Sequence, residues 1–293
     1  MTPGAPCHGC RDTERLGRRR FFKLLASGAA LALAGVGLGT RPASGTRARR
    51  PGSVPVAGPA PIVADAGGGP PLTLGDIPPP RPGAPQLLWH APAATQQIAL
   101  TVDDGYCGDC IAKYVEFAQS SGIHLTMNPN GIYADLWTPS IVAATRQMVA
   151  NKQVQIGNHT WDHANLLSLS DSAIQDELNR NEAWIQQTFG TTARPYFRPP
   201  YGYYNQRVIQ AAADIGYTQV VMWNGTFGDS SPESPQALMS LAEQWLQPGT
   251  IMLGHLNQPT ILSLFSQIES IIAQRNLEPV TLDEMFGTSR AMG

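Results

Sequence analysis

The sequence predicts an α/β protein built on a parallel sheet. From Ile98 onward, short apolar runs rich in β-forming residues alternate with segments of helical period. Such an alternation is typical of parallel sheets, because each helix returns the chain to the edge at which the next strand begins. Polar strings follow several of the apolar runs, at the edge where folds of this class build their functional sites. This pattern alone allows an open sheet or a closed barrel.

Seven short apolar runs are predicted to be strands. They are Ile98–Val102, His124–Met127, Val154–Ile156, Tyr196–Arg198, Thr218–Met222, Thr250–Leu253 and Pro279–Leu282. Six segments between them are predicted to be helices. They are Ile111–Ser120, Pro139–Ala150, Asp171–Phe189, Gln206–Ile215, Pro235–Leu246 and Ile261–Arg275. Thr138-Pro139 and Ser234-Pro235 indicate two helix starts, each an N-cap followed by Pro in the first turn.

Residues 1–45 are predicted to be a signal peptide. Arg18-Arg19-Arg20-Phe21-Phe22-Lys23 resembles the twin-arginine export consensus, and an apolar stretch from Leu24 to Gly39 follows it. That stretch is shorter than the roughly 20 residues of a membrane span, as is typical of a signal sequence. We expect export to the extracellular space or the cell wall, with membrane contact only through the leader. An uncleaved N-terminal anchor is the alternative.

Residues 46–85 are predicted to be a linker, because they are mostly Pro, Gly and Ala, and residues 86–293 a single catalytic domain. Residues 1–50 hold 10 of the 20 basic and 2 of the 22 acidic residues. The body therefore keeps 10 basic and 20 acidic residues, a net charge of about −10. This acidic body argues against a nucleic-acid partner and favours a weakly charged or neutral polymer. We expect the protein to be a monomer.

Three short strings carry chemical groups. Thr101-Val102-Asp103-Asp104-Gly105, His159-Thr160-Trp161-Asp162-His163 and Arg198-Pro199-Pro200-Tyr201-Gly202 supply two carboxylates, two imidazoles and an arginine. One carboxylate oxygen and two imidazole nitrogens form the donor set of a mononuclear metal site with a position left for water, as in catalytic zinc sites. The strings therefore predict a hydrolase.

The spacing within the strings adds two expectations. Asp103 and Asp104 end a buried strand, and in extended geometry they point to opposite sides, so that one binds a metal and the other faces substrate. His159 and His163 lie one helical turn apart, a spacing at which two imidazoles chelate one ion.

These strings make the chain similar to the polysaccharide deacetylase family, the NodB-homology or carbohydrate esterase 4 group. They match the first three motifs of that family, and Leu253-Gly254-His255 matches the fifth. The similarity extends from about Gln86 to Phe286. It implies a distorted (β/α)7-type barrel with a single catalytic domain.

The resemblance also implies a metal site and a base. Asp104, His159 and His163 would hold a divalent ion, with zinc expected and cobalt or nickel as alternatives. Asp103 would be the general base that takes a proton from water during attack on an acetyl carbonyl, and the ion lowers the pKa of that water toward about 7.

The remaining roles follow from the same resemblance. His255 would protonate the departing group, and Asp229 is the best match for the carboxylate set against it. Arg198 would pair with the base, and the backbone N–H of Tyr201 would stabilise the oxyanion together with the ion.

Two segments depart from the family pattern. Residues 223–230 read Trp-Asn-Gly-Thr-Phe-Gly-Asp-Ser, where the family often has Trp-Asp-x-Asp and then Asp-Trp. Thr126-Met127-Asn128-Pro129-Asn130 replaces a usual aromatic run. These changes leave the chemistry in place and the substrate preference open. Four aromatic residues are candidates for stacking on sugar rings, with core packing as the alternative: Trp161, Trp223, Tyr203 and Tyr204.

Cys107-Gly108-Asp109-Cys110 follows the carboxylate pair directly. In an exported protein this spacing favours a structural disulfide that stiffens the loop after Asp104. A redox role and a thiolate in the metal set are the alternatives. Cys7-His8-Gly9-Cys10 lies in the leader and carries no prediction.

The predicted function is a secreted, metal-dependent deacetylase. It would hydrolyse N-acetyl or O-acetyl groups of an acetylated glycan such as chitin oligomers or peptidoglycan. One alternative is a glycan-binding protein of the same fold with weak catalysis, against which the retention of Asp103, His255 and Arg198 argues. The other is a thiol oxidoreductase that uses Cys107 and Cys110.

Overall fold

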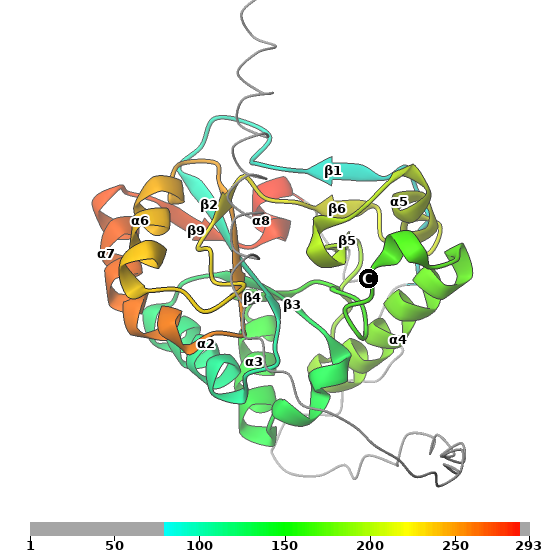
Figure 1. Cartoon of the computed structure of the whole chain (residues 1–293), viewed down its shortest axis with the longest axis horizontal. Helices are drawn as coiled ribbons and strands as arrows, with labels where there is room; N and C mark the ends of the chain where they lie inside the picture. Colours follow the sequence, from blue (N-terminus) through cyan, green and yellow to red (C-terminus); the bar gives the residue numbers. More distant parts are fainter. Residues whose placement is uncertain (1–78, 288–293) are drawn as a thin grey trace, which may run out of the picture. The chain divides into compact units, whose positions relative to one another are not determined.

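The structure is a computed structural model that describes residues 79–287 (Figure 1). The predicted signal peptide (1–45) and residues 46–78 of the predicted linker lie outside the described residues, so both assignments stay predictions. Residues 79–85 form no regular element, and the first strand begins at Gln86. Within 79–287, no helix combines the length and apolar character needed to cross a bilayer.

All seven predicted strands are present, and two further strands accompany them. The strands are β1 Gln86–Leu88, β2 Gln97–Asp104, β3 Leu125–Pro129, β4 Val154–Ile156, β5 Tyr196–Phe197, β6 Gln219–Val221, β7 Gly225–Thr226, β8 Ile251–His255 and β9 Glu278–Val280. The two that the sequence did not reveal, β1 and β7, span three and two residues, which is too short for a periodic pattern.

All six predicted helices are also present, and one further α-helix, α8, follows them. The α-helices are α2 Gly108–Ser121, α3 Pro139–Ala150, α4 Asp171–Phe189, α5 Gln206–Ala213, α6 Pro235–Trp245, α7 Phe265–Gln274 and α8 Leu282–Phe286. The 3-10 helices are η2 Gly131–Leu136, η3 Leu166–Ser168, η4 Pro200–Gly202 and η5 Pro259–Leu264. The helix predicted over 261–275 is divided, because its first part belongs to η5 and only the rest is α7.

Helix α8 corrects the last predicted strand, which was expected to continue to Leu282. Thr281 instead starts a helix: its side chain accepts a hydrogen bond from the Glu284 N–H, and the Glu284 carboxylate accepts one from the Thr281 N–H. This reciprocal capping box satisfies backbone donors at the helix start, so β9 ends at Val280.

The strands form a parallel arrangement with one interruption, as expected for a distorted (β/α)7-type barrel. One sheet has the order β4-β3-β2-β8-β7, with β9 also paired to β2, and the other has the order β1-β6-β5. A parallel bridge between Asn158 and Phe197 joins the end of β4 to β5. The consecutive strands β6 and β7 share no pairing among the described residues, and this gap is the distortion.

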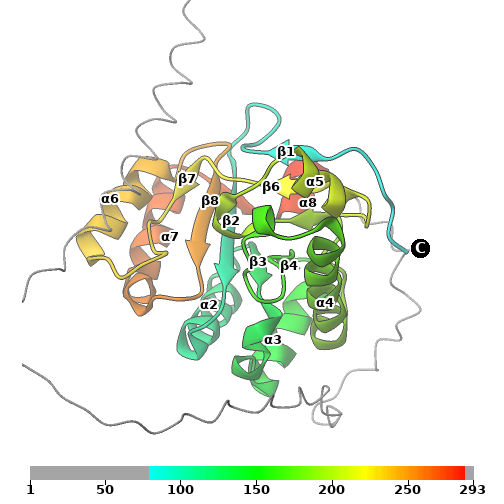
Figure 2. The same cartoon turned by 45° about the vertical axis from the view of Figure 1, so that its right-hand side comes forward.

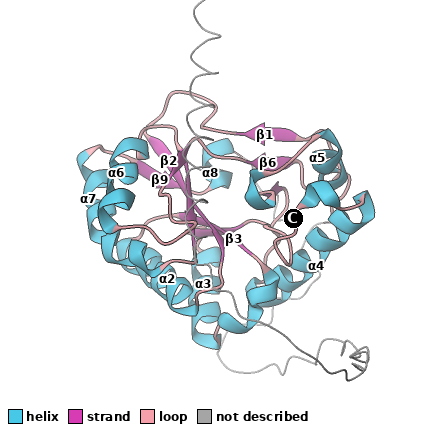
Figure 3. Cartoon of the chain, in the orientation of Figure 1, coloured by secondary structure: helices cyan, strands magenta, loops and turns pink. Residues whose placement is uncertain are grey.

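Helices surround the strands (Figure 3). Helix α4 illustrates how they pack: Ser170 caps its start, Gly190 ends it in the left-handed conformation, and Ile174, Leu178 and Ile185 are buried along one face. Figure 2 shows β2 and β8 side by side in the centre, and the parallel register sets Asp103 beside His255. On the other edge of β2, Asp103 pairs with Asn128 of β3. Three polar residues therefore form a row across the carboxyl ends of three adjacent strands.

Candidate active site

The carboxylate pair ends β2, and it departs from the expected geometry. Asp104 has a φ of 70°, so extended backbone does not continue past Asp103. As a result both carboxylates approach the same imidazole: His159 Nε2 lies 3.8 Å from Asp103 Oδ2 and 3.3 Å from Asp104 Oδ1. The expectation that the two side chains point to opposite sides is therefore wrong. A left-handed Asp is uncommon but tolerated, and here it turns the second carboxylate toward the histidines.

Asp103 is 2% exposed and pairs with a buried cation. Its Oδ1 accepts hydrogen bonds from Arg198 Nη1 at 2.7 Å and from Asn128 Nδ2 at 2.8 Å. These two donors hold one carboxylate oxygen and leave Oδ2 on the side of His159. Asp103 is thus an oriented carboxylate, with one oxygen free for proton transfer.

Arg198 is itself held on all sides. Nε donates to the Val221 carbonyl, and Nη2 donates to the Thr101 hydroxyl at 2.8 Å. The side chain is 1% exposed, so its charge is desolvated and depends on these partners and on Asp103. Its backbone also takes part, because the Arg198 carbonyl accepts from His159 Nδ1 at 2.8 Å.

Asp104, His159 and His163 form a cluster suited to a metal ion. One atom of each, a carboxylate oxygen or an imidazole nitrogen, lies within 4.8 Å of the others. Asp104 Oδ1 is buried without a hydrogen-bonding partner, 3.3 Å from His159 Nε2 and 3.4 Å from His163 Nε2. A buried, unsatisfied carboxylate oxygen aimed between two imidazoles costs free energy unless a cation meets it, so the donor set fits a divalent ion.

The two histidines lie in an irregular loop, not on a helix as their spacing had suggested. Thr160 and His163 have φ values of 69° and 62°. Polar side chains from other elements replace helical hydrogen bonds here: Glu177 of α4 accepts from the amides of residues 161 and 162, and Asn130 donates to the carbonyls of residues 159 and 160. The bond from His159 Nδ1 to the Arg198 carbonyl leaves Nε2 free to face Asp104.

The charges of these groups depend on one another. Burial disfavours the ionised form of Asp104, but His159 outweighs it, with smaller contributions from His255 and His163, and holds the pKa of Asp104 far below its usual value. Burial likewise disfavours a charged His159, yet Asp103 and Asp104 raise its pKa above normal. Burial and the neighbouring His159 lower the pKa of His163 to about 4. His163 is therefore neutral at neutral pH, the form that can bind a metal.

His255, at the end of β8, is paired with another buried carboxylate, that of Asp229. Its Nδ1 lies 2.9 Å from Asp229 Oδ1, and its backbone N–H donates to Asp229 Oδ2 at 3.0 Å. Asp229 is fully buried. Burial opposes a charged imidazole, but the hydrogen bond and the charge of Asp229 raise the pKa of His255 above its usual value. The site therefore holds an imidazole that keeps its proton to higher pH, beside a carboxylate paired with arginine.

Comparison with known proteins places this geometry in a family. The sequence profile of the family described as polysaccharide deacetylase matches residues 90–220, a range that includes Asp103, Asp104, both histidines of the cluster and Arg198. Residues 90–220 match the polysaccharide deacetylase family. His255 and Asp229 lie beyond the matched range, so their pairing in the structure adds to what the profile covers.

Two curated relatives are deacetylases of acetylated glycans by name. A peptidoglycan-N-acetylglucosamine deacetylase of Bacillus cereus is 25% identical, over 69% of this chain and 72% of the relative. A chitin deacetylase of Pestalotiopsis sp is 25% identical, over 66% of this chain and 64% of the relative. The predicted enzyme class, hydrolases of non-peptide carbon–nitrogen bonds, is that of these relatives. Other relatives are matched over less of their length, down to 22% in one case.

Solved structures support the fold. A family 4 carbohydrate esterase from Streptomyces lividans, in complex with acetate, is 28% identical with a TM-score of 0.55, over 63% of this chain and 92% of that one. A family 4 pseudoenzyme from Bacillus anthracis is 18% identical with a TM-score of 0.61, over 69% of each chain. The deacetylase fold therefore occurs in an esterase and in a pseudoenzyme.

Tyr201, the fourth residue of the motif that follows β5, has an unusual backbone conformation. Its φ is 60° inside η4, and its ring meets His163 edge to face, with centroids 4.4 Å apart. The ring is 58% exposed, and that of Tyr203 lies 5.6 Å away and is 48% exposed. Tyr201 therefore borders the metal cluster with both its backbone and its ring.

Of the four aromatic residues proposed to stack on sugars, only Tyr203 is largely exposed. Trp161, Trp223 and Tyr204 are partly buried against the core, and the guanidinium of Arg180 lies 4.0 Å over the Trp161 ring. An exposed aromatic that sequence reasoning missed is Tyr106, 45% exposed, whose ring lies 6.0 Å from that of Tyr133.

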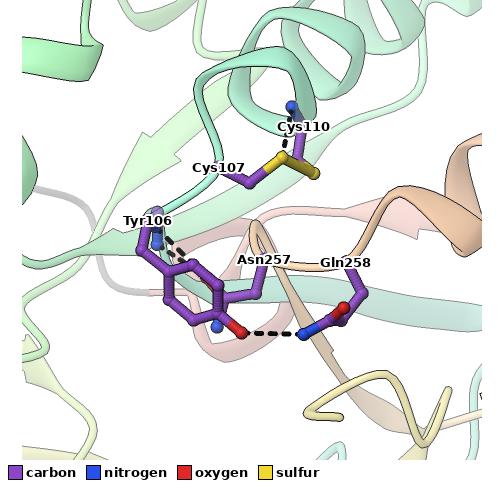
Figure 4. Close-up of a disulfide and its surroundings, with 6 residues drawn as sticks. Tyr106, Cys107, Cys110, Asn257 and Gln258 are labelled. Carbon is purple, nitrogen blue, oxygen red and sulfur yellow. Dashed lines mark hydrogen bonds between the residues drawn. A yellow bond between two sulfur atoms is a disulfide. The ribbon is translucent and has the colours of Figure 1, made fainter. Parts of the chain in front are cut away.

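The expected disulfide is present (Figure 4). Cys107 and Cys110 are joined, and the Cys107 sulfur accepts a hydrogen bond from the Cys110 N–H at the start of α2. Cys110 is fully buried. The disulfide thus closes the first turn of the helix that follows the carboxylate loop, which is the structural role expected for it.

Polar residues of the site that were not predicted as functional include Asn128, Glu177 and Asn257. Asn128 contacts Asp103, Glu177 holds the histidine loop, and Asn257 donates to Asp104. Asn128 and Asn257 each follow closely on a predicted strand, at the edge where the site lies. That position was the only signal available, and Asn is too common at strand ends for it to decide a role.

Proposed function

We propose that the protein is an exported, metal-dependent deacetylase that hydrolyses N-acetyl groups, or O-acetyl groups, of a polysaccharide such as chitin oligomers or peptidoglycan. The observation that carries the proposal is the donor cluster of Asp104, His159 and His163, with an oriented carboxylate base and a carboxylate-paired imidazole beside it. A binding site for glycan alone needs neither proton carrier.

The base side of the reaction falls to Asp103. Its Oδ1 is occupied by Arg198 and Asn128, so Oδ2 is the oxygen that takes a proton from the attacking water. Asp104, His159 and His163 would hold the divalent ion, Zn²⁺ by preference for this mixed oxygen and nitrogen set, with Co²⁺ or Ni²⁺ as alternatives. When bound, the ion supplies Lewis-acid chemistry to water and the acetyl carbonyl.

The acid side falls to His255. Its Nδ1 is bonded to Asp229, which leaves Nε2 as the nitrogen that delivers a proton to the departing amine or alkoxide. Because Asp229 raises the pKa of His255, the imidazole is protonated at the start of the cycle over a wider pH range. The backbone N–H of Tyr201 is assigned to the oxyanion, since this residue lies against His163.

The substrate is proposed to be a glycan on the basis of the rim of the site. Tyr201 and Tyr203 present exposed rings next to the metal cluster, and Tyr106 presents another beside Tyr133. Aromatic rings of this kind contact the apolar faces of sugar rings while their hydroxyls reach polar groups. The acidic body of the chain suits a neutral polymer better than an anionic one.

Acetate release tests the proposal. Purified mature protein would be assayed on chitin oligosaccharides, peptidoglycan and acetylxylan, after chelation and after return of Zn²⁺, Co²⁺ or Ni²⁺, with Asp103→Asn as the matched control. We expect release from at least one glycan, loss on chelation and recovery with metal. The binding alternative wins if no metal-loaded sample releases acetate while parent and Asp103→Asn bind glycan equally.

Export is proposed from the leader alone. Arg18 and Arg19 occupy the invariant positions of the twin-arginine-like string. Replacing both with Lys keeps the charge and removes the motif. We expect the double variant to accumulate inside the producing cell as precursor, as seen by immunoblot of cell and medium fractions. Unchanged export would show that another route carries the protein.

A further inference from the structure

Asn257 lies two residues beyond His255 and contacts the proposed metal ligand Asp104. Its Nδ2 donates to Asp104 Oδ2 at 2.6 Å, and the residue is 5% exposed. Its Oδ1 accepts from the backbone N–H groups of Gly105 and Tyr106, at 3.2 and 3.3 Å. Figure 4 shows this side chain between the start of the Tyr106 loop and the end of β8. One buried amide therefore contacts the ligand and the two residues after it.

The orientation of this amide is fixed by chemistry. Backbone N–H groups only donate, so the atom facing Gly105 and Tyr106 must be the carbonyl oxygen. The NH₂ group then faces Asp104, whose carboxylate only accepts when ionised. A rotated amide would set two oxygens together and leave two backbone donors unpaired, of which the Gly105 N–H is buried. Asn257 can occupy one state only, as a donor to Asp104.

This contact makes the two oxygens of Asp104 unequal. Oδ2 has a short hydrogen bond from Asn257, whereas Oδ1 is buried without a partner between the two imidazoles. The neighbouring carboxylate shows the same division, since Asp103 Oδ1 accepts from Asn128 and Arg198 and Oδ2 does not. In each case a side-chain amide donates to one carboxylate oxygen. The other oxygen is then left for metal binding in Asp104 or for proton transfer in Asp103.

We propose that Asn257 is a positioning residue that restricts Asp104 to one oxygen in metal binding, which leaves more of the coordination sphere to water and substrate. The inference rests on the proposed metal site. Without the Asn257 donor, the freed Oδ2 can turn toward the ion, and the loop from Gly105 to Tyr106 loses its anchor. Partners of this kind commonly contribute about 10- to 100-fold to metal affinity or activity.

The test uses Asn257→Ala in the full mature protein, with Gln258→Ala as matched control. Gln258 is the next residue, and its amide donates to the Tyr106 hydroxyl instead of Asp104. Zinc affinity would be measured by competition with a chromogenic chelator, and Co²⁺ coordination by visible absorption. We expect Asn257→Ala to weaken zinc binding about 10- to 100-fold. Its Co²⁺ bands should also lose intensity, because an added oxygen ligand raises the coordination number. Gln258→Ala should behave as the parent.

A second variant covers the case in which Asn257→Ala does not fold. Asn257→Asp keeps the volume and the acceptor oxygen for Gly105 and Tyr106. It replaces the donor to Asp104 with a second acceptor oxygen and, when ionised, adds a negative charge there. Recorded at about pH 9, where a free carboxyl is ionised, its Co²⁺ spectrum should show the same loss of intensity. Parent-like zinc affinity and Co²⁺ spectra in folded variants would overturn the inference. A parent protein that binds no metal would instead overturn the proposed function.

Discussion

Asp103 and Asp229 are both buried carboxylates of the candidate site, and they differ in the cation that each one meets. Asp103 faces the guanidinium of Arg198, a permanent cation. Asp229 faces the imidazole of His255, which can lose its proton, so the effect of the carboxylate appears in the pKa of its partner. The same residue type thus supports a base in one place and an acid in the other, according to whether its partner titrates.

The largest expected effect comes from removing the base. Asp103→Asn keeps the shape of the side chain and its contact with Arg198, but it cannot accept the proton from water. We expect kcat to fall about 10²- to 10⁴-fold. Metal content, measured by atomic emission, should stay as in the parent because Asp104 and the histidines are intact. Loss of metal together with activity would instead assign Asp103 to the ligand set.

Removing the permanent cation tests the ionic half of the comparison. Arg198→Met leaves the Asp103 charge buried with no cation, and we expect a loss of about 3–5 kcal/mol in the free energy of unfolding. Urea unfolding of the metal-free protein measures it. The double variant with Asp103→Asn should recover part of this loss, since no charge is then left unpaired. Equal losses in the single and double variants would mean that Arg198 acts mainly through its other contacts.

Removing the second carboxylate tests the titrating half. Asp229 raises the pKa of His255, so in Asp229→Asn that pKa falls. The acid must be protonated to act, and activity is lost as pH rises through its pKa. The alkaline limb of the kcat profile should therefore move to lower pH. If the alkaline limb of the kcat profile does not move, a group other than His255 sets it.

The smallest loss of stability is expected from removing the Thr101 hydroxyl, a neutral hydrogen-bonding partner of Arg198. Thr101→Val keeps the shape but removes the hydroxyl that accepts from Arg198 Nη2. We expect about 1–2 kcal/mol of lost stability, as for a hydrogen bond to a charged group. Thermal unfolding measures it, with Thr145→Val as a buried control whose hydroxyl bonds only within its own helix. A cost as large as that of Arg198→Met would place the orienting role in the hydroxyl instead of the ion pair.

Long periodic segments made most of the fold predictable from the sequence. Helices α3 and α4 match their predicted bounds residue for residue, because Pro139 follows the N-cap of α3 and the Ser170 side chain caps the start of α4. Strands β1 and β7 carry no such pattern. Helix α8 depends on a capping box between Thr281 and Glu284, which begins inside the apolar run that predicts the last strand.

The candidate site divides in a similar way. Residue type and order predicted residues that the structure brings together: Asp104, His159 and His163 in one cluster, with Asp103 and His255 on adjacent strands. Backbone conformation was not predictable, since the left-handed Asp104 and His163 follow from tertiary contacts. The supporting residues, Asn257 above all, were not predictable either. Their role depends on which atoms they contact across the barrel. Because those atoms belong to residues far away in the sequence, no local sequence pattern indicates the contact.

The pairing of β2 has a consequence for local stability. Its eight residues are bonded to β3, β8 and β9, so the backbone that presents Asp103 and Asp104 should open to hydrogen exchange only with the whole domain. The loop with His159 and His163 is held by side chains such as Asn130 and Glu177, and it can open alone. The proposed metal ligands therefore come from one region that should exchange slowly and another that should exchange faster. An ion held by both would join them into a single cooperative unit.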